Sequence, residues 1–74
     1  MTFSECLEMA KYLNIAWRGF FTEKEIKENA RDYYIELKEN KTDSDIIKAL
    51  LVGLKEDVEN GSKESEKWYN KLVS

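Results

Sequence analysis

A chain of 74 residues with 42% hydrophobic and 36% charged side chains has enough apolar material for one small folded domain and too much for a disordered segment. The 15 acidic and 12 basic residues give a formal charge of −3 and are scattered, so the basic stripe that nucleic-acid binding usually needs is absent. Proline is also absent and glycine occurs only three times, which favours helices over a turn-rich β fold.

The first helix is predicted from Thr2 to about Asn14. Thr2 is followed three residues later by Glu5, the spacing of a capping box at a helix start. Apolar residues then recur at intervals of three and four, which predicts one buried stripe on an amphipathic helix. The predicted stripe is Phe3, Leu7, Ala10, Leu13 and Trp17.

The densest apolar segment, residues 15–21, contains Gly19 and leads directly into another helix start. We predict a connector whose aromatic rings are buried, because a short chain gains most by burying its largest side chains. Thr22 and Glu25 form a second capping box, and the helix that follows is expected to end near Asn40. Its predicted inner face is Ile26, Ala30, Tyr33, Tyr34 and Leu37.

A third helix is predicted to begin at about Asp43, within a run of residues that favour helix starts, and to stop at Asn60-Gly61. Its apolar stripe is Ile46, Ile47, Leu50, Leu51, Leu54 and Val58. A short last helix is predicted from Ser62 to about Val73, with Trp68, Leu72 and Tyr69 on one face. The sequence therefore predicts an all-α fold: a small four-helix bundle of three main helices and a short C-terminal helix, in a single domain of residues 1–74.

Catalytic chemistry is not indicated by the residue types present. Histidine is absent, so Cys6 lacks the base that usually activates a cysteine nucleophile. For the same reason Cys6 has no histidine with which to form a zinc site. No glycine-rich phosphate loop occurs. We expect no enzyme, no cofactor, no catalytic residue and no metal site, with Cys6 as a buried or half-buried helix residue. One cysteine, no leader and no membrane span together predict a cytoplasmic protein.

The nine aromatic side chains are the interesting surplus in so small a chain. Tyrosine, tryptophan and arginine dominate the binding energy of protein interfaces. The sequence therefore offers a candidate docking patch for a protein partner, and core packing is the competing interpretation for the same residues. The candidate partner-binding residues are Trp17, Arg18, Phe20, Tyr33 and Tyr69.

Four segments, taken in order, carry a family resemblance. They are Thr2-Phe3-Ser4-Glu5, Trp17-Arg18-Gly19-Phe20-Phe21, the pair Tyr33-Tyr34 before Leu37, and Asp45-Ile46-Ile47-Lys48-Ala49-Leu50. Residues 2–54 resemble the amino-terminal helical domain of the bacteriophage replicative-helicase loader/inhibitor family, found in phages of low-GC Gram-positive bacteria. The resemblance implies a phage or prophage accessory protein that binds a component of the DNA replication machinery, such as a replicative helicase or an initiator, without ATPase activity.

Two other functions stay open at this point. Carboxylates at Glu56, Asp57, Glu59, Glu64 and Glu66 could imitate a phosphate track in a small acidic inhibitor of a host nucleic-acid enzyme. A self-associating structural bundle would instead form a homodimer with buried aromatics and no other partner.

Overall fold

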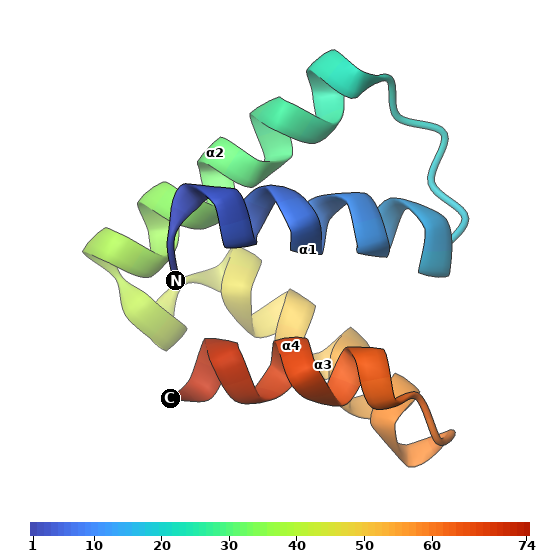
Figure 1. The fold of residues 1–74 in the computed structure, drawn as a ribbon. Coiled ribbons are helices and arrows are strands. Elements are labelled where there is room, and N and C mark those ends of the chain that lie inside the picture. The colour runs from blue at the N-terminus through green and yellow to red at the C-terminus, as the bar shows by residue number, and fades with distance from the viewer. The chain divides into compact units, whose positions relative to one another are not determined.

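Four α-helices and one short 3-10 helix make up the computed structural model, which describes residues 1–74 and contains no strand (Figure 1). The helices are α1 (Phe3–Ala16), α2 (Glu23–Glu39), η1 (Lys41–Asp43), α3 (Asp45–Glu59) and α4 (Lys63–Val73). The predicted all-α fold with three longer helices and a short C-terminal helix is confirmed.

The chain divides into two compact units, residues 1–35 and residues 36–74. The first unit holds α1 and most of α2, and the second holds the end of α2 together with η1, α3 and α4. The boundary falls inside α2, which continues across it as one helix. That residues 1–74 form a single domain stays a prediction.

The starts of α1, α2 and α4 lie where the local sequence placed them. Thr2 and Glu5 exchange both bonds of a capping box: Thr2 N–H donates to Glu5 Oε1 at 2.9 Å, and Glu5 N–H donates to Thr2 Oγ1 at 3.1 Å. Thr22 and Glu25 repeat the arrangement at 3.1 and 3.3 Å. Ser62 begins α4 by accepting the backbone N–H of Ser65. Because a cap involves residues three apart, a sequence reveals it directly.

The third helix begins two residues later than predicted. Residues 41–43 form η1, and Ser44 is the cap of α3, its hydroxyl accepting the N–H of Ile47 at 3.4 Å. The preceding turn is also held at Glu36, whose carboxylate accepts a hydrogen bond from Asn40 Nδ2 at 2.9 Å. Hydrogen bonds from Asn40 and then Ser44 lower the pKa of Glu36 below its ordinary value.

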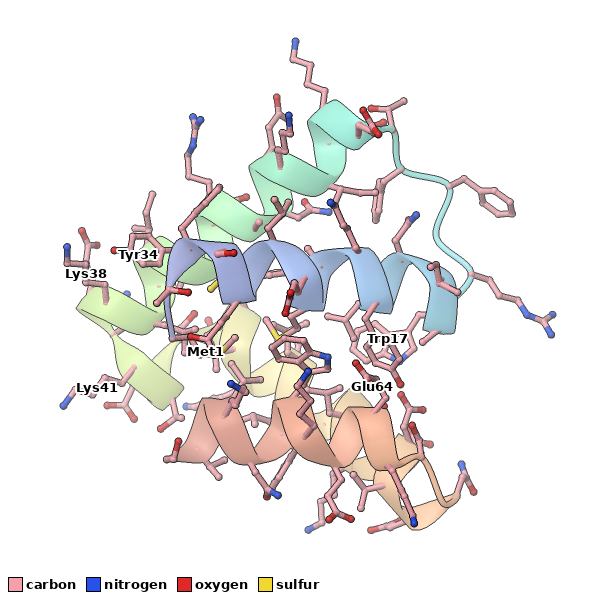
Figure 2. All side chains as sticks on the ribbon, viewed as in Figure 1. Met1, Trp17, Tyr34, Lys38, Lys41 and Glu64 are labelled. Carbon is pink, nitrogen blue, oxygen red and sulfur yellow. The ribbon has the colours of Figure 1, made fainter.

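The buried face of α1 differs in part from the predicted stripe. It consists of Cys6, Met9, Ala10 and Leu13. Phe3 and Trp17 are substantially exposed and Leu7 is half-buried. Cys6 and Met9 share the three-and-four spacing of Ala10 and Leu13, so two overlapping stripes fit the sequence. The ring of Phe3 instead meets that of Tyr34 edge-on, with centroids 6.0 Å apart, and Tyr34 lies beside the start of α1 (Figure 2).

Helix α2 carries charged side chains along most of its exposed face. Ala30 is its one fully buried residue. The other predicted inner residues are half-buried: Ile26, Tyr33, Tyr34 and Leu37. The predicted solvated face is exposed: Lys24, Lys27, Glu28, Arg31, Asp32, Lys38 and Glu39.

In the second unit α3 and α4 form a helical hairpin (Figure 1). The core residues are Ile47, Leu50 and Leu54 from α3 with Ser65, Trp68 and Leu72 from α4. Trp68 is only 1% exposed, and its indole N–H donates to Glu64 at 3.2 Å. Ser65, fully buried, donates its hydroxyl to Asp57 at 3.2 Å. Ile46 was predicted inside and is partly exposed, because it lies in the first turn of α3, one residue before Ile47.

None of the four helices combines the length and the hydrophobicity that crossing a membrane requires.

Candidate functional site

The connector between α1 and α2 exposes its apolar side chains. We call Trp17–Phe21 the aromatic loop. Phe20 is 96% exposed, Phe21 50% and Trp17 41%, and Ile15 just before the loop is 79% exposed. The prediction that these rings are buried is therefore wrong. Ring burial depends on whether another element reaches the ring, and hydrophobicity alone does not supply that element.

The loop begins with a tightly hydrogen-bonded end of α1. Gly19 N–H donates to Asn14 O at 2.8 Å, and Arg18 N–H donates to Ile15 O at 3.3 Å. Together these are the two bonds of a Schellman motif, in which the residue after the cap takes a left-handed conformation. That residue is Arg18, with φ of 52°. Glycine is the usual choice there, since a left-handed backbone costs a residue with a Cβ about 1–2 kcal/mol.

Asn14 also fixes the far side of the aromatic loop. Its side-chain oxygen accepts the backbone N–H of Phe21 at 3.2 Å. A Cβ added to Gly19 would lie 2.5 Å from that oxygen, so only glycine fits without displacing the amide of Asn14. The loop is thus a defined backbone conformation that presents exposed rings on either side of Arg18.

The five predicted partner-binding residues fall in three places. Trp17, Arg18 and Phe20 lie together in the aromatic loop. Tyr33 is half-buried on α2 in the first unit, and burial followed by the charge of Asp32 raises the pKa of its hydroxyl. Tyr69 is half-buried on α4 in the second unit. The aromatic loop is therefore the one place where three of the candidates lie in a single exposed segment.

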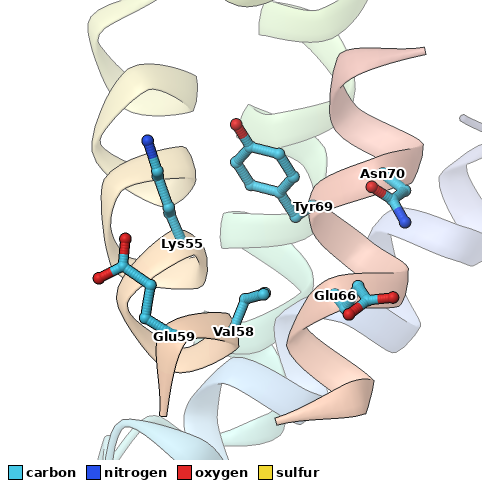
Figure 3. A pocket seen from close by; sticks show the side chains of 6 residues that line it. All are labelled: Lys55, Val58, Glu59, Glu66, Tyr69 and Asn70. Carbon is cyan, nitrogen blue, oxygen red and sulfur yellow. The ribbon is translucent and has the colours of Figure 1, made fainter. Parts of the chain in front are cut away.

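Tyr69 lines a groove on the α3–α4 hairpin, which we call the hairpin groove (Figure 3). Its volume is about 340 Å³. The lining residues are Lys55, Val58 and Glu59 from α3 and Glu66, Tyr69 and Asn70 from α4. The sequence analysis singled out Tyr69 and missed the groove. The sequence signal for the groove was two pairs of residues four apart, 55 with 59 and 66 with 70, on either side of the Asn60-Gly61 stop. Residues four apart lie on neighbouring turns of the same helix face.

Neither a metal-binding cluster nor an activated cysteine is formed by the described side chains. No three cysteine, aspartate or glutamate side chains gather where they could hold a metal ion. Cys6 is fully buried, as predicted for a structural residue, and burial raises the pKa of its thiol. A buried, protonated thiol is a poor nucleophile.

No protein-family model, curated protein or solved structure matches this chain.

Proposed function

We propose that this protein is a non-enzymatic binding module that docks on a protein partner through its aromatic loop. The observation that carries the proposal is the exposure of the apolar side chains at Ile15, Trp17, Phe20 and Phe21 within one short stretch of a small chain. Contiguous exposed apolar surface is unfavourable in water and marks sites of protein interaction.

The geometry of the loop supports the same proposal. Trp17 and Arg18 are residue types that dominate interface energies, and Phe20 extends almost its whole surface into solvent. Asn14 accepts the backbone N–H groups of Gly19 and Phe21, which holds the loop backbone after Arg18, so little conformational entropy is lost on docking. Arg18 also accepts a left-handed conformation that costs stability, and strain of this kind clusters at functional positions.

The partner that fits this loop has an apolar pocket for one or two rings and carboxylates or carbonyl groups at its rim for Arg18. The resemblance of residues 2–54 to the phage helicase loader/inhibitor family supports a partner in the replication machinery. We therefore propose a phage or prophage accessory protein that acts in the cytoplasm on a replicative helicase or an initiator.

The test is direct binding of the purified protein to the replicative helicase and to the initiator of a low-GC Gram-positive bacterium, by biolayer interferometry at rising salt. We expect one of them to bind with little salt dependence, because the contact is mainly apolar. Phe20→Ala should weaken that binding about 30-fold, a loss of about 2 kcal/mol, typical of a hot-spot ring.

Val52→Ala is the matched control, since Val52 is 68% exposed on α3, outside the aromatic loop. Both variants should keep the wild-type melting temperature. Binding to neither protein would contradict the replication partner, and equal binding by Phe20→Ala would contradict the role of the aromatic loop.

The two alternatives give different results in the same assay. A phosphate mimic would bind a nuclease or polymerase and lose it steeply with salt. Two of the five carboxylates that this alternative uses are engaged internally, Asp57 with Ser65 and Glu64 with Trp68, which disfavours it. A self-associating protein would show a dimer by light scattering that Phe20→Ala dissociates.

A further inference from the structure

The turn between α3 and α4 places the dipeptide Asn60-Gly61 at the surface (Figure 1). An asparagine side chain can react with the backbone nitrogen of the next residue, and glycine leaves that nitrogen unhindered because it has no Cβ. Every other asparagine of the chain is followed by a residue that has a Cβ: Asn14, Asn29, Asn40 and Asn70. Asn60 is therefore the asparagine at which this reaction meets the least steric resistance.

The folded end of α3 holds Asn60 in a conformation that cannot react. Ring closure requires the Cβ of Asn60 and the nitrogen of Gly61 to be eclipsed about the Cα–C bond. With ψ of 5° the backbone nitrogen of Asn60 occupies the eclipsed position instead, so the Cβ is turned away. The attacking nitrogen is also engaged, because Gly61 N–H donates to Val58 O at 2.9 Å. Attack therefore requires this helix end to open.

We propose that Asn60 is a site of spontaneous deamidation and that the folded end of α3 controls its rate. In the opened turn the nitrogen of Gly61 gives its proton to a base in the solvent and attacks Cγ of Asn60. The Cγ–Nδ2 bond breaks, the leaving group takes up a proton and departs as ammonia, and a succinimide ring remains. Water then opens the ring at either carbonyl, which leaves aspartate or isoaspartate at position 60. This modification does not rest on the function proposed for the aromatic loop.

Either product disfavours re-formation of the helix end. Both add a carboxylate at the C-terminus of α3, where the helix dipole repels negative charge and Glu59 is already present. Isoaspartate also routes the main chain through Cβ, which adds one methylene to the backbone before Gly61. That extra atom moves the two N–H donors of the helix end out of register with their acceptors on α3. The modified hairpin is therefore less stable than the original one.

The test follows deamidation of the purified full chain at mildly alkaline pH, in native buffer and in unfolding urea. Peptide mass spectrometry locates the modified asparagine, and isoaspartyl methyltransferase measures isoaspartate. In urea Asn60 should react before the other asparagines, and in the folded protein it should react at least about tenfold more slowly, because opening is needed first. A blocked peptide of residues 58–63, too short to form the helix end, controls for the solvent and should react equally in both.

The products are compared with the unmodified protein by urea unfolding after ion exchange has separated them by their added charge. Asn60→Asp reproduces the aspartate product alone, and Asn60→Ser is the matched control that cannot deamidate. We expect the urea midpoint to fall from the unmodified protein to Asn60→Asp, and further in the isoaspartyl form. Equal rates in folded and unfolded protein, earlier reaction at another asparagine, or an isoaspartyl form as stable as the unmodified protein would each overturn the proposal.

Discussion

Arg18 and Gly61 occupy the same position in two helix ends of the same type. At the end of α3, Gly61 N–H donates to Val58 O at 2.9 Å and Ser62 N–H to Asp57 O at 3.0 Å, the same two bonds that end α1. Gly61 has φ of 96° and Arg18 has φ of 52°, so both backbones are left-handed. Only Arg18 has a Cβ to strain there. The Gly61 helix end is therefore an internal comparison for the free energy that the left-handed backbone of Arg18 costs.

Arg18→Gly should raise the free energy of unfolding by about 1 kcal/mol, the relieved strain less the greater flexibility of glycine in the unfolded chain. For a domain of this size the melting temperature rises by about 4–8 °C. Gly61→Arg should lower the melting temperature by a similar amount. Thermal unfolding followed by circular dichroism measures the melting temperature of both variants. A destabilised Arg18→Gly protein would contradict this account. If the aromatic loop binds a partner, the stabilised variant should also bind it less tightly.

Ionisation of the Cys6 thiol makes the free energy of unfolding depend on pH in the alkaline range. Its pKa is raised chiefly by burial, opposed by the N-terminal charge and assisted by Glu5. In the unfolded chain the thiol loses its proton above about pH 8.5, whereas in the folded protein it retains the proton to higher pH. The unfolded state therefore binds fewer protons there, and the free energy of unfolding falls as pH rises through this window.

Urea unfolding between pH 7 and 10.5 tests this dependence. The wild-type protein should lose stability above about pH 8.5 more steeply than Cys6→Ala, which lacks the titrating thiol. Tyr33, whose pKa is also raised, is present in both proteins and is the internal control. Parallel pH profiles for the two proteins would contradict a contribution from Cys6.

At the scale of elements, the sequence was informative wherever structure is decided within a few residues. The boxes at Thr2 and Thr22, the cap at Ser62 and the stop at Gly61 all lie where they were predicted, because each involves partners three to five residues apart. The predicted last residue of α1 and the predicted first residue of α3 were less accurate. Helix α1 continues to Ala16, and α3 starts only after η1.

Which face an element buries could not be settled the same way. Cys6 and Met9 lie inside where Phe3 and Leu7 were predicted, since both sets have helical spacing. The aromatic loop was predicted buried from its composition, yet its rings are exposed. Of the candidate site, the sequence singled out Trp17, Arg18 and Phe20, and the exposure of Trp17 and Phe20 disagrees only with the competing interpretation that these rings pack in the core. Their use by a partner stays a prediction.

Helix α4 has 11 residues, too short to be stable alone, so its order depends on the side chains it buries. Trp68→Ala should cost about 3 kcal/mol or more, because the ring is almost fully buried and a cavity remains. Val73→Ala, on the same helix but about half exposed, should have a small effect. Chemical unfolding monitored by far-UV circular dichroism measures both, and an unchanged curve for Trp68→Ala would contradict a docked α4.

For the whole molecule, the two units raise the question of how the chain unfolds. They have 35 and 39 residues. Domains below about 40 residues usually need a metal, a disulfide or a partner subunit to fold alone. Neither unit holds a disulfide or a cluster that could bind a metal. We therefore predict that residues 1–74 unfold in a single cooperative transition.

Native-state hydrogen exchange measures this cooperativity in each unit separately. Interior amides of α1, such as that of Leu13, and of α3, such as that of Leu54, should exchange with the same opening free energy and the same dependence on denaturant. Trp68→Ala adds the sharper comparison, since the substitution lies in the second unit alone. In a cooperative chain it lowers the protection of Leu13 in the first unit by as much as that of Leu54. If only Leu54 loses protection, the two units unfold independently and the prediction of one domain is wrong.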